Sequence, residues 1–305
     1  MSKLVECIPN FSEGRDQTVI DALVQTAKGV PGVTLLDHSS DPDHNRSVLT
    51  LLGDPAGMAE AAFLLCQCAS RHINLTQHQG VHPRMGATDV IPFVPIRNIT
   101  VAECVALSNT VAKRISDELH IPTFLYEHAA TRPERENLAN IRRGQFEGLP
   151  EKLSDPAWAP DYGNPERHPT AGATAVGARP PLVAFNINLD TDNVEIAKAI
   201  AKSIRGSSGG YQYCKSIGLM LSDRNTAQVS MNMVNCEHTP LYRVFEAVRF
   251  EAKRWGVGII GSELIGLAPA KALIDCAAYY LQIEQFDYDQ QVLENHFPPT
   301  ATPAP

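Results

Sequence analysis

The chain has 305 residues, of which 44% are hydrophobic and 20% are charged, and its formal net charge is −8. This composition is typical of a globular protein with a sizeable core, in one large domain or two of ordinary size. Basic residues form no run longer than a pair such as Arg142-Arg143, whereas nucleic-acid binding needs a dense basic surface. Nucleic acid is therefore excluded as the main partner, but a small anion in a locally basic pocket is not.

The N-terminal segment MSKLVECIPNF has neither the long apolar region of a signal peptide nor a stretch that approaches a membrane-spanning helix. The seven cysteines are scattered, most of them in apolar segments, and no pair has the spacing of a zinc ribbon. We therefore expect buried, reduced thiols, no membrane partner and a cytoplasmic location.

In the first half, the spacing of apolar residues and the turn residues between them predict alternating strands and helices. The predicted elements, in chain order, are a strand at 4–11, a helix at 16–29, strands at 33–39 and 47–53, a helix at 55–73, a strand at 88–96, a helix at 100–119 and a strand at 123–127.

The second half is clearer, because its helices carry start and stop signals such as Thr239, Pro240 and Gly256 around one amphipathic segment. The order β-α-β-β-α-β is the split βαβ arrangement, and the first half repeats it. We therefore predict an α+β fold of two modules with related topology. The predicted elements are a strand at 181–189, a helix at 191–206, strands at 215–222 and 227–235 around the turn DRN, a helix at 239–256, a strand at 257–263 and a helix at 268–282.

Residues 145–180, between the halves, are rich in Pro, Gly, Asp and Asn. Long irregular segments of this kind are functional loops or disordered linkers. Because this one carries Trp158, Tyr162 and His168, we interpret it as an ordered loop that lines a cleft between the modules. The C-terminal sequence FPPTATPAP is predicted to be disordered.

The segment HQGVHPRMGATD contains His78 and His82, four residues apart. A His-x-x-x-His pair indicates zinc only when both rings lie on one face of a helix, and Gly80 and Pro83 disfavour a helix here. Two alternatives stay open. The histidines cap a turn, or the segment is a catalytic loop in which Arg84 holds a carboxylate and His82, near its ordinary pKa of about 6.5, takes and gives a proton.

The segment LDHSSDPDHNRSV places Asp41, Asp43 and Asn45 in a pattern that superficially resembles a calcium loop. The glycine and the terminal glutamate of such a loop are missing, so a metal is not favoured. A plain hairpin turn explains Asp-Pro-Asp, but it does not explain His44 and Arg46. A ligand-binding turn is the alternative.

Other motifs carry less information. VECIPNFSEGRD puts Asn10 after a strand and just before a helix, where a small ligand can bind. RGSSGG lacks the ending of a phosphate-binding loop, and there is neither a G-x-S-x-G sequence nor a full dinucleotide fingerprint. Taken alone, the residues support acid-base chemistry on a small anion, without a metal.

Four segments, VECIPNFSEGR, HQGVHPRMGATDVIPFVPI, GATAVGARPPLVAFNINL and GSELIGLAPAKAL, together resemble the glutamate formimidoyltransferase family over about residues 2–285. The resemblance implies a one-carbon transferase of histidine degradation. It would move the formimino group of N-formimidoyl-L-glutamate to N5 of tetrahydrofolate, its co-substrate, giving 5-formimidoyltetrahydrofolate and L-glutamate. It also implies a stand-alone cytoplasmic homodimer without a cyclodeaminase domain, with a separate cyclodeaminase as a partner for the product.

The implied fold is two α/β subdomains of ferredoxin-like topology, with sheets facing each other, helices on the outside and folate between them. We place these subdomains at 1–178, including the loop 145–178, and at 179–290, followed by a disordered tail at 291–305. The family's catalytic histidine falls on His82. Its folate-binding segment falls on Gly163, Asn164, Pro165, Glu166, Arg167, His168, Pro169, Thr170, Ala171 and Gly172, of which Gly163, Pro169 and Gly172 fit the family pattern best.

Further binding residues are expected around these positions, and they are Asn10, Asp41, His44, Arg46, Arg84 and Arg179. The three arginines would hold the carboxylates of glutamate and of the folate tail. One of Asp41, Asp43 and Asp89 would stabilise the cationic amidine. His82 would act first as a base and then as an acid.

Three rival functions stay open. They are a related folate-dependent formyl or formimino transferase or cycloligase with another donor, a non-catalytic folate-binding protein, and a metal-dependent hydrolase.

Overall fold

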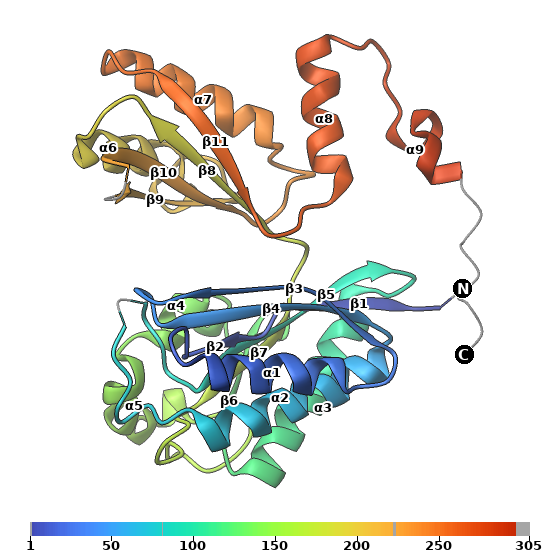
Figure 1. Ribbon diagram of the computed structural model, residues 1–305, viewed down its shortest axis with the longest axis vertical. Coiled ribbons are helices and arrows are strands. Elements are labelled where there is room, and N and C mark those ends of the chain that lie inside the picture. Colours follow the sequence, from blue (N-terminus) through green and yellow to red (C-terminus); the bar gives the residue numbers. More distant parts are fainter. Residues whose placement is uncertain (1, 81, 222–223, 297–305) are drawn as a thin grey trace. The chain divides into compact units, whose positions relative to one another are not determined.

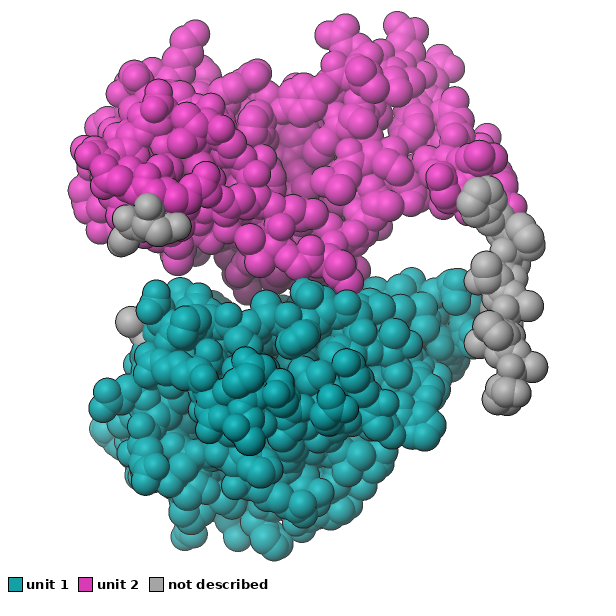
Figure 2. Space-filling view, in the orientation of Figure 1, with its two compact units in different colours: residues 1–180 teal, residues 181–305 magenta. Residues whose placement is uncertain are grey.

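The computed structural model describes residues 2–80, 82–221 and 224–296. The chain divides into two compact units, residues 1–180 and 181–305, which Figure 1 traces and Figure 2 colours separately. The division falls between Pro180 and Pro181, two consecutive prolines that favour extended backbone. Each unit has a hydrophobic core of its own.

The first unit contains every element predicted for that half, with ends that shift by a few residues. The predicted strand at 4–11 is interrupted and forms two strands. The elements are β1 (Leu4–Cys7), β2 (Asn10–Phe11), α1 (Gln17–Lys28), β3 (Val33–Asp41), β4 (Arg46–Gly53), α2 (Pro55–His72), β5 (Thr88–Arg97), α3 (Val101–Leu119), β6 (Thr123–Glu127), α4 (Leu138–Arg142), α5 (Gln145–Ser154) and β7 (Thr174–Ala178).

Seven strands of the described part form one mixed sheet in the order β1-β4-β2-β5-β7-β6, with β3 paired to β4. Strand β7 pairs in parallel with β5 and β6, whereas the other pairings are antiparallel. Figure 1 shows α1, α2 and α3 on one face of this sheet. Their apolar residues pack with buried strand residues such as Leu49, Leu51 and Phe93 to form the core.

Local sequence explains where these helices begin. Asp16 accepts a hydrogen bond from the first turn of α1, and Asp54 does the same for α2. Thr100 and Glu103 form a reciprocal capping box at the start of α3. Such caps satisfy backbone N–H groups that have no partner inside the helix.

The prediction of an irregular loop over 145–180 was wrong at both ends. The segment starts with α5 and ends with β7, which lies between β5 and β6 in the sheet. All five residues of β7, TAVGA, are buried, and a side chain at Gly177 would collide with the ring of Tyr126. A parallel strand that is buried on both faces shows no alternation of apolar and polar residues. Its small residues therefore led to the prediction of a loop.

The second unit contains the predicted β-α-β-β-α-β order, followed by a helix. Its sheet is antiparallel with the strand order β11-β8-β10-β9, and α6 and α7 contribute to one core with it. The elements are β8 (Val183–Leu189), α6 (Val194–Ile204), β9 (Cys214–Leu221), β10 (Thr226–Met233), α7 (Leu241–Arg254), β11 (Ile259–Ile265), α8 (Ala270–Leu281) and α9 (Tyr288–Gln291).

Three predicted features fall partly outside the described residues. They are the strand at 215–222, whose Ser222 lies outside, the turn DRN, whose Asp223 lies outside, and the C-terminal tail. Of the tail predicted to be disordered, residues 297–305 lie outside, whereas Leu293–His296 form a short 3-10 helix.

The seven cysteines are all free. Five of them are buried, and Cys236 and Cys276 are partly buried, which agrees with the predicted thiols. Across residues 2–80, 82–221 and 224–296, no helix is both long and apolar enough to cross a membrane.

Candidate functional site

The loop before β5 places His82 beside two side chains from neighbouring strands. Because β2 pairs with both β4 and β5, Asn10 at the start of β2 and Arg46 at the start of β4 come together. The Nη1 atom of Arg46 lies 2.8 Å from Nδ1 and 2.9 Å from Nε2 of His82. Its Nη2 donates to Oδ1 of Asn10. Thus Asn10, Arg46 and His82, predicted from separate motifs, form one cluster.

Asp89, the second residue of β5, is the carboxylate beneath this cluster. It is only 1% exposed, and its Oδ1 accepts a hydrogen bond of 2.8 Å from the backbone N–H of Met85. Its Oδ2 lies 3.6 Å from Nη1 of Arg46 and 2.5 Å from Nη2 of Arg142. Two guanidinium groups therefore share one carboxylate, which leaves the cluster with a net positive charge.

Arg142 reaches the cluster because the end of α4 is held in place. Asn137 caps the start of this short helix by accepting from the N–H of Ala139. At its other end, Nζ of Lys152 donates to the carbonyls of Asn140 at 2.7 Å and Ile141 at 2.5 Å. These bonds satisfy carbonyls that a helix leaves unpaired at its C-terminus. The helix end is thereby fixed beside Asp89.

The pKa of His82 differs from the value expected from the sequence. Burial, together with the positive charges of Arg46 and Arg142 and against the effect of Asp89, lowers the pKa of His82 from 6.5 to about 3. The expected pKa near 6.5 was therefore wrong, because the sequence does not show the two arginines around the ring. A guanidinium has only donors, and a neutral imidazole has one unprotonated nitrogen, so only that nitrogen can accept a hydrogen bond from Arg46. The neutral imidazole has the lone pair that a base needs, but in the free protein Arg46 donates to it and the low pKa makes the ring a weak base.

Asp41 and His44 lie at the end of β3 and in the turn that follows. Asp41 accepts hydrogen bonds from the backbone N–H groups of Asp43 and His44, both at 2.9 Å, and from Nδ1 of His44 at 2.7 Å. The ring of His44 lies 6.2 Å from that of His82, between centroids. The aspartate therefore shapes the turn, as the hairpin alternative predicts, and brings a second histidine close to the cluster.

Arg84 already has a carboxylate partner. It is 7% exposed and forms a two-pronged ion pair with Glu147, with N–O distances of 2.8 and 2.7 Å. Its Nε donates to Nδ1 of His78 at 3.1 Å. The hydrogen bonds from Arg84 lower the pKa of Glu147 to about 2. Arg84 thus fixes its loop to α5, and we assign it this role rather than the binding of a substrate.

Arg179 lies apart from the cluster. It follows β7, where its N–H donates to the carbonyl of Phe93 at 3.1 Å. Because Val90 pairs with Ala175, Asp89 lies opposite Thr174 in the sheet. The backbone of Arg179 is therefore roughly 16 Å further along the strand direction, at about 3.3 Å per residue. Among the described residues no contact joins Arg179 to His82. The Arg179 side chain reaches Tyr126, whose pKa is raised by burial against the smaller, lowering effect of the charges of Arg179 and Arg142.

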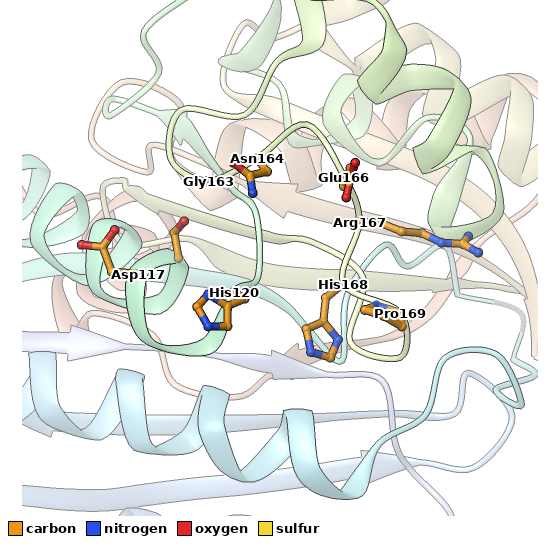
Figure 3. Close-up of a pocket in the computed structure, with 9 residues that line it drawn as sticks. Asp117, His120, Gly163, Asn164, Glu166, Arg167, His168 and Pro169 are labelled. Atoms are coloured by element: carbon orange, nitrogen blue, oxygen red, sulfur yellow. The ribbon is translucent and has the colours of Figure 1, made fainter.

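The predicted folate segment lines a pocket of about 590 Å³ against the end of α3 (Figure 3). In Figure 3 the rings of His120 and His168 lie side by side, and the side chain of Arg167 extends away from them. Arg167 continues into a second pocket of about 560 Å³, in which it stacks on Phe146. The residues that line the first pocket are Ser116, Asp117, His120, Gly163, Asn164, Glu166, Arg167, His168 and Pro169.

The last residues of the segment form a tight turn. His168 and Gly172 exchange backbone hydrogen bonds of 2.9 and 3.0 Å, and Nδ1 of His168 accepts from the N–H of Ala171 at 3.0 Å and, more weakly, from Thr170. Burial, followed by the charge of His120, lowers the pKa of His168. Pro165 is exposed and does not line the pocket. His168 is thereby kept neutral and fixed by its own turn.

The pocket and the His82 cluster are separate but connected. His82 is not among the residues that line the pocket. Gly172 pairs with Gly86, and the N–H of Ala173 donates to the carbonyl of Met85 at 3.0 Å, so the folate segment is bonded to the loop that carries His82. A change in one can therefore displace the other.

Gly172→Ala is expected to disturb this connection. Its φ is +70°, and a Cβ there would lie 2.0 Å from the carbonyl oxygen of Met85, so we expect a loss of about 1–3 kcal/mol of stability and weaker folate binding. Thermal unfolding and a folate titration measure both. The matched control is Gly148→Ala in α5, where a Cβ meets nothing within 4 Å and stability should stay equal or rise slightly. Equal behaviour of the two variants would contradict the proposed strain.

Comparison with known proteins identifies the family. The sequence model of the family described as "Formiminotransferase domain, N-terminal subdomain" matches residues 4–179. The family model described as "Formiminotransferase domain" matches residues 184–295. The chain belongs to the formiminotransferase family. The resemblance predicted from the four sequence segments is thereby confirmed.

Named relatives of this formiminotransferase are similar over nearly all of its length. Glutamate formimidoyltransferase of Streptococcus pyogenes serotype M1 is 68% identical over 296 residues, 97% of this chain and 99% of that protein. Glutamate formimidoyltransferase of Thermoplasma acidophilum is 46% identical and covers 93% of this chain and 94% of its own. Formimidoyltransferase-cyclodeaminase of Mus musculus is 44% identical and matches 93% of this chain but 54% of its own length.

One residue of the formiminotransferase cluster was missed by sequence reasoning. Arg142 stood out only as part of a basic pair, and α4, which carries it, was not predicted. Asp89 was one of three carboxylates named for the amidine, and its burial was not anticipated. The available signal was an aspartate at the start of a strongly apolar strand, since a buried carboxylate needs a cationic partner.

Proposed function

We propose that the protein is a glutamate formimidoyltransferase that transfers the formimino group of N-formimidoyl-L-glutamate to N5 of tetrahydrofolate. The observation that carries this proposal is the 68% identity to an enzyme of that name across 97% of the chain. Tetrahydrofolate is the co-substrate, and the products are 5-formimidoyltetrahydrofolate and L-glutamate. The reaction belongs to histidine degradation.

In the proposed reaction, N5 attacks the amidine carbon, and a new C–N bond forms in a tetrahedral intermediate. N5 loses its proton to His82, which later gives it to the glutamate nitrogen as the old C–N bond breaks. The ring is neutral in the free protein, as a base must be, but its low pKa there makes it a weak base that needs a change in its surroundings to take the proton. Such acid-base catalysis contributes typically about 10² to 10⁴ in rate.

The other residues receive roles that follow from their surroundings. Asp89 has both oxygens near groups of the chain and is 1% exposed, so it positions Arg46 and Arg142 and does not touch the amidine. The part of the segment 163–172 that lines the pocket beside α3 binds part of the folate there, and the turn at 170–172 holds that part in place. His44, held by Asp41, lies near enough to His82 to contact a bound substrate.

The proposal also covers the topology of the second subdomain, the oligomeric state, the location and the partner of the protein. The strand order β11-β8-β10-β9 supports ferredoxin-like topology for the second subdomain. A homodimer and a separate cyclodeaminase that receives the product complete the proposal, and both rest on the family resemblance. A cytoplasmic location is proposed from the free, mostly buried cysteines. The facing of the two sheets stays a prediction.

The purified protein, given tetrahydrofolate and N-formimidoyl-L-glutamate, is expected to form 5-formimidoyltetrahydrofolate, detected by ultraviolet absorbance. N-formimidoylglycine and N-formylglutamate should be turned over much more slowly, because the first lacks the side-chain carboxylate and the second lacks the amidine. Faster turnover of either would favour another transferase of this kind. Tight folate binding with no turnover of any donor would favour a non-catalytic folate-binding protein.

A further inference from the structure

The His82 cluster has more positive charge than its one buried carboxylate neutralises. Asp89 faces the guanidinium groups of Arg46 and Arg142, whose side chains are 17% and 15% exposed. The Nε and Nη2 atoms of Arg142 are buried and make no aligned hydrogen bond among the described residues, although Nη2 lies 2.5 Å from Asp89. Buried donors normally have partners. The excess charge and the Nε of Arg142, which has no hydrogen-bond partner among the described residues, together indicate that an anion belongs here.

Arg46 also contacts the ring nitrogens through which His82 would take and give a proton. Its Nη1 lies within 2.9 Å of both ring nitrogens, and it can only donate. The lone pair of the imidazole is therefore engaged by a cation rather than free to take a proton. A carboxylate is a stronger partner for a guanidinium than a neutral ring. An incoming carboxylate would thus compete for Arg46 and free the ring.

We propose that Arg46 and Arg142 bind the α-carboxylate of the formimidoyl donor, and that this binding turns His82 into an effective base. The inference rests on the proposed function. In N-formimidoyl-L-glutamate, only one nitrogen and one carbon separate the α-carboxylate from the amidine carbon. A carboxylate held on arginines that touch His82 therefore places the reacting carbon beside that ring. The glutamate of tetrahydrofolate lies beyond the aminobenzoyl group from N5 and cannot bring N5 there in the same way.

The electrostatic consequence follows from the charges that face His82. These are Arg46 on β4, Arg142 on α4 and Asp89 on β5, with His44 of the turn after β3 nearby. The two arginines outweigh the aspartate in the free protein. A bound carboxylate would offset one positive charge, which favours the protonated ring. The pKa of His82 should therefore rise from about 3 toward its ordinary range when the donor binds.

The direct test is an NMR titration of the full-length protein labelled in its histidines, with His82→Asn used to assign the signal. We expect saturating L-glutamate, which carries the same α-carboxylate, to raise the pKa of His82 by at least about one pH unit. p-Aminobenzoyl-L-glutamate represents the folate tail and should not do so. An unchanged pKa, or a response to the folate fragment alone, would overturn the assignment to the donor.

Variants of Arg142 give a second, kinetic test. Arg142→Gln is expected to raise KM for N-formimidoyl-L-glutamate about 10- to 100-fold and to leave KM for tetrahydrofolate unchanged, since it loses a charged carboxylate contact. It should also raise the pKa of His82 in the free protein, because it removes one of the positive charges that lower that pKa. Arg142→Lys keeps the charge but not the planar fork, so it should raise KM and leave that pKa low.

Arg143→Gln is the matched control, because Arg143 is the exposed neighbour of Arg142 and its side chain donates to Asn140, outside the His82 cluster. It should match the parent in KM and in the pKa of His82. If folded Arg142→Gln and Arg142→Lys both keep KM for the donor within about threefold, the proposed subsite is wrong. Absence of turnover in the parent protein would instead contradict the proposed function.

Discussion

His82→Ala is expected to lower kcat by at least about a hundredfold, while folding and tetrahydrofolate binding are retained. The variant removes the group that takes the proton from N5 and returns it to the leaving nitrogen. Folding should survive because the ring is only partly buried and its side-chain contact is with Arg46, which keeps Asn10 as an acceptor. The formimino-transfer assay measures kcat, and a tetrahydrofolate titration measures binding.

His38→Ala is the control for this experiment, because His38 is exposed on β3 and lies outside the cluster. It should retain nearly the activity of the parent. A His82→Ala protein within a few-fold of the parent kcat would show that another group moves the proton. His44 would then be the first alternative to examine, since its ring is 6.2 Å from His82.

Asp89→Asn is expected to destabilise the first unit by about 3 kcal/mol or more. The amide leaves two largely buried guanidinium groups without a carboxylate, and that uncompensated charge is the source of the loss. At about 2–4 °C per kcal/mol for a unit of this size, the Tm should fall by roughly 6–12 °C. Thermal unfolding followed by circular dichroism provides the measurement.

The control is Asp21→Asn on α1, where an exposed aspartate accepts a hydrogen bond of 2.8 Å from Gln17. Its loss should change stability by less than about 1 kcal/mol, as for other exposed polar pairs. A comparable Tm for both variants would mean that Arg46 and Arg142 do not depend on Asp89 for their charge balance.

The sequence predicted elements well where apolar spacing is regular. The helix predicted at 239–256 is α7, and the strand at 88–96 is β5. Strand β7 was missed because its small buried residues carry neither of the two periods on which such predictions rely. Its place is fixed by partners on both sides, β5 and β6, and pairing over such distances leaves no local signal.

The site shows the same limit. Resemblance singled out His82, and the motifs suggested Asn10 and Arg46. In the structure Arg46 contacts both Asn10 and the ring of His82. The role of Arg142 depends on where α4 ends, and the low pKa of His82 depends on charges brought in from β4 and α4. Both properties depend on the distances between these side chains and on their burial, which cannot be predicted from the spacing of residues along the chain.

The central strand of the first unit has a consequence for how the chain folds. Strand β5 pairs with β1, where Glu6 meets Val94, with β2, and with β7, where Phe93 meets Ala178. All three partners are far from it along the chain, and such distant pairings slow folding. During synthesis, β5 stays an open edge until β7 has left the ribosome. A chain that stops short of β7 should consequently aggregate rather than form a smaller stable unit.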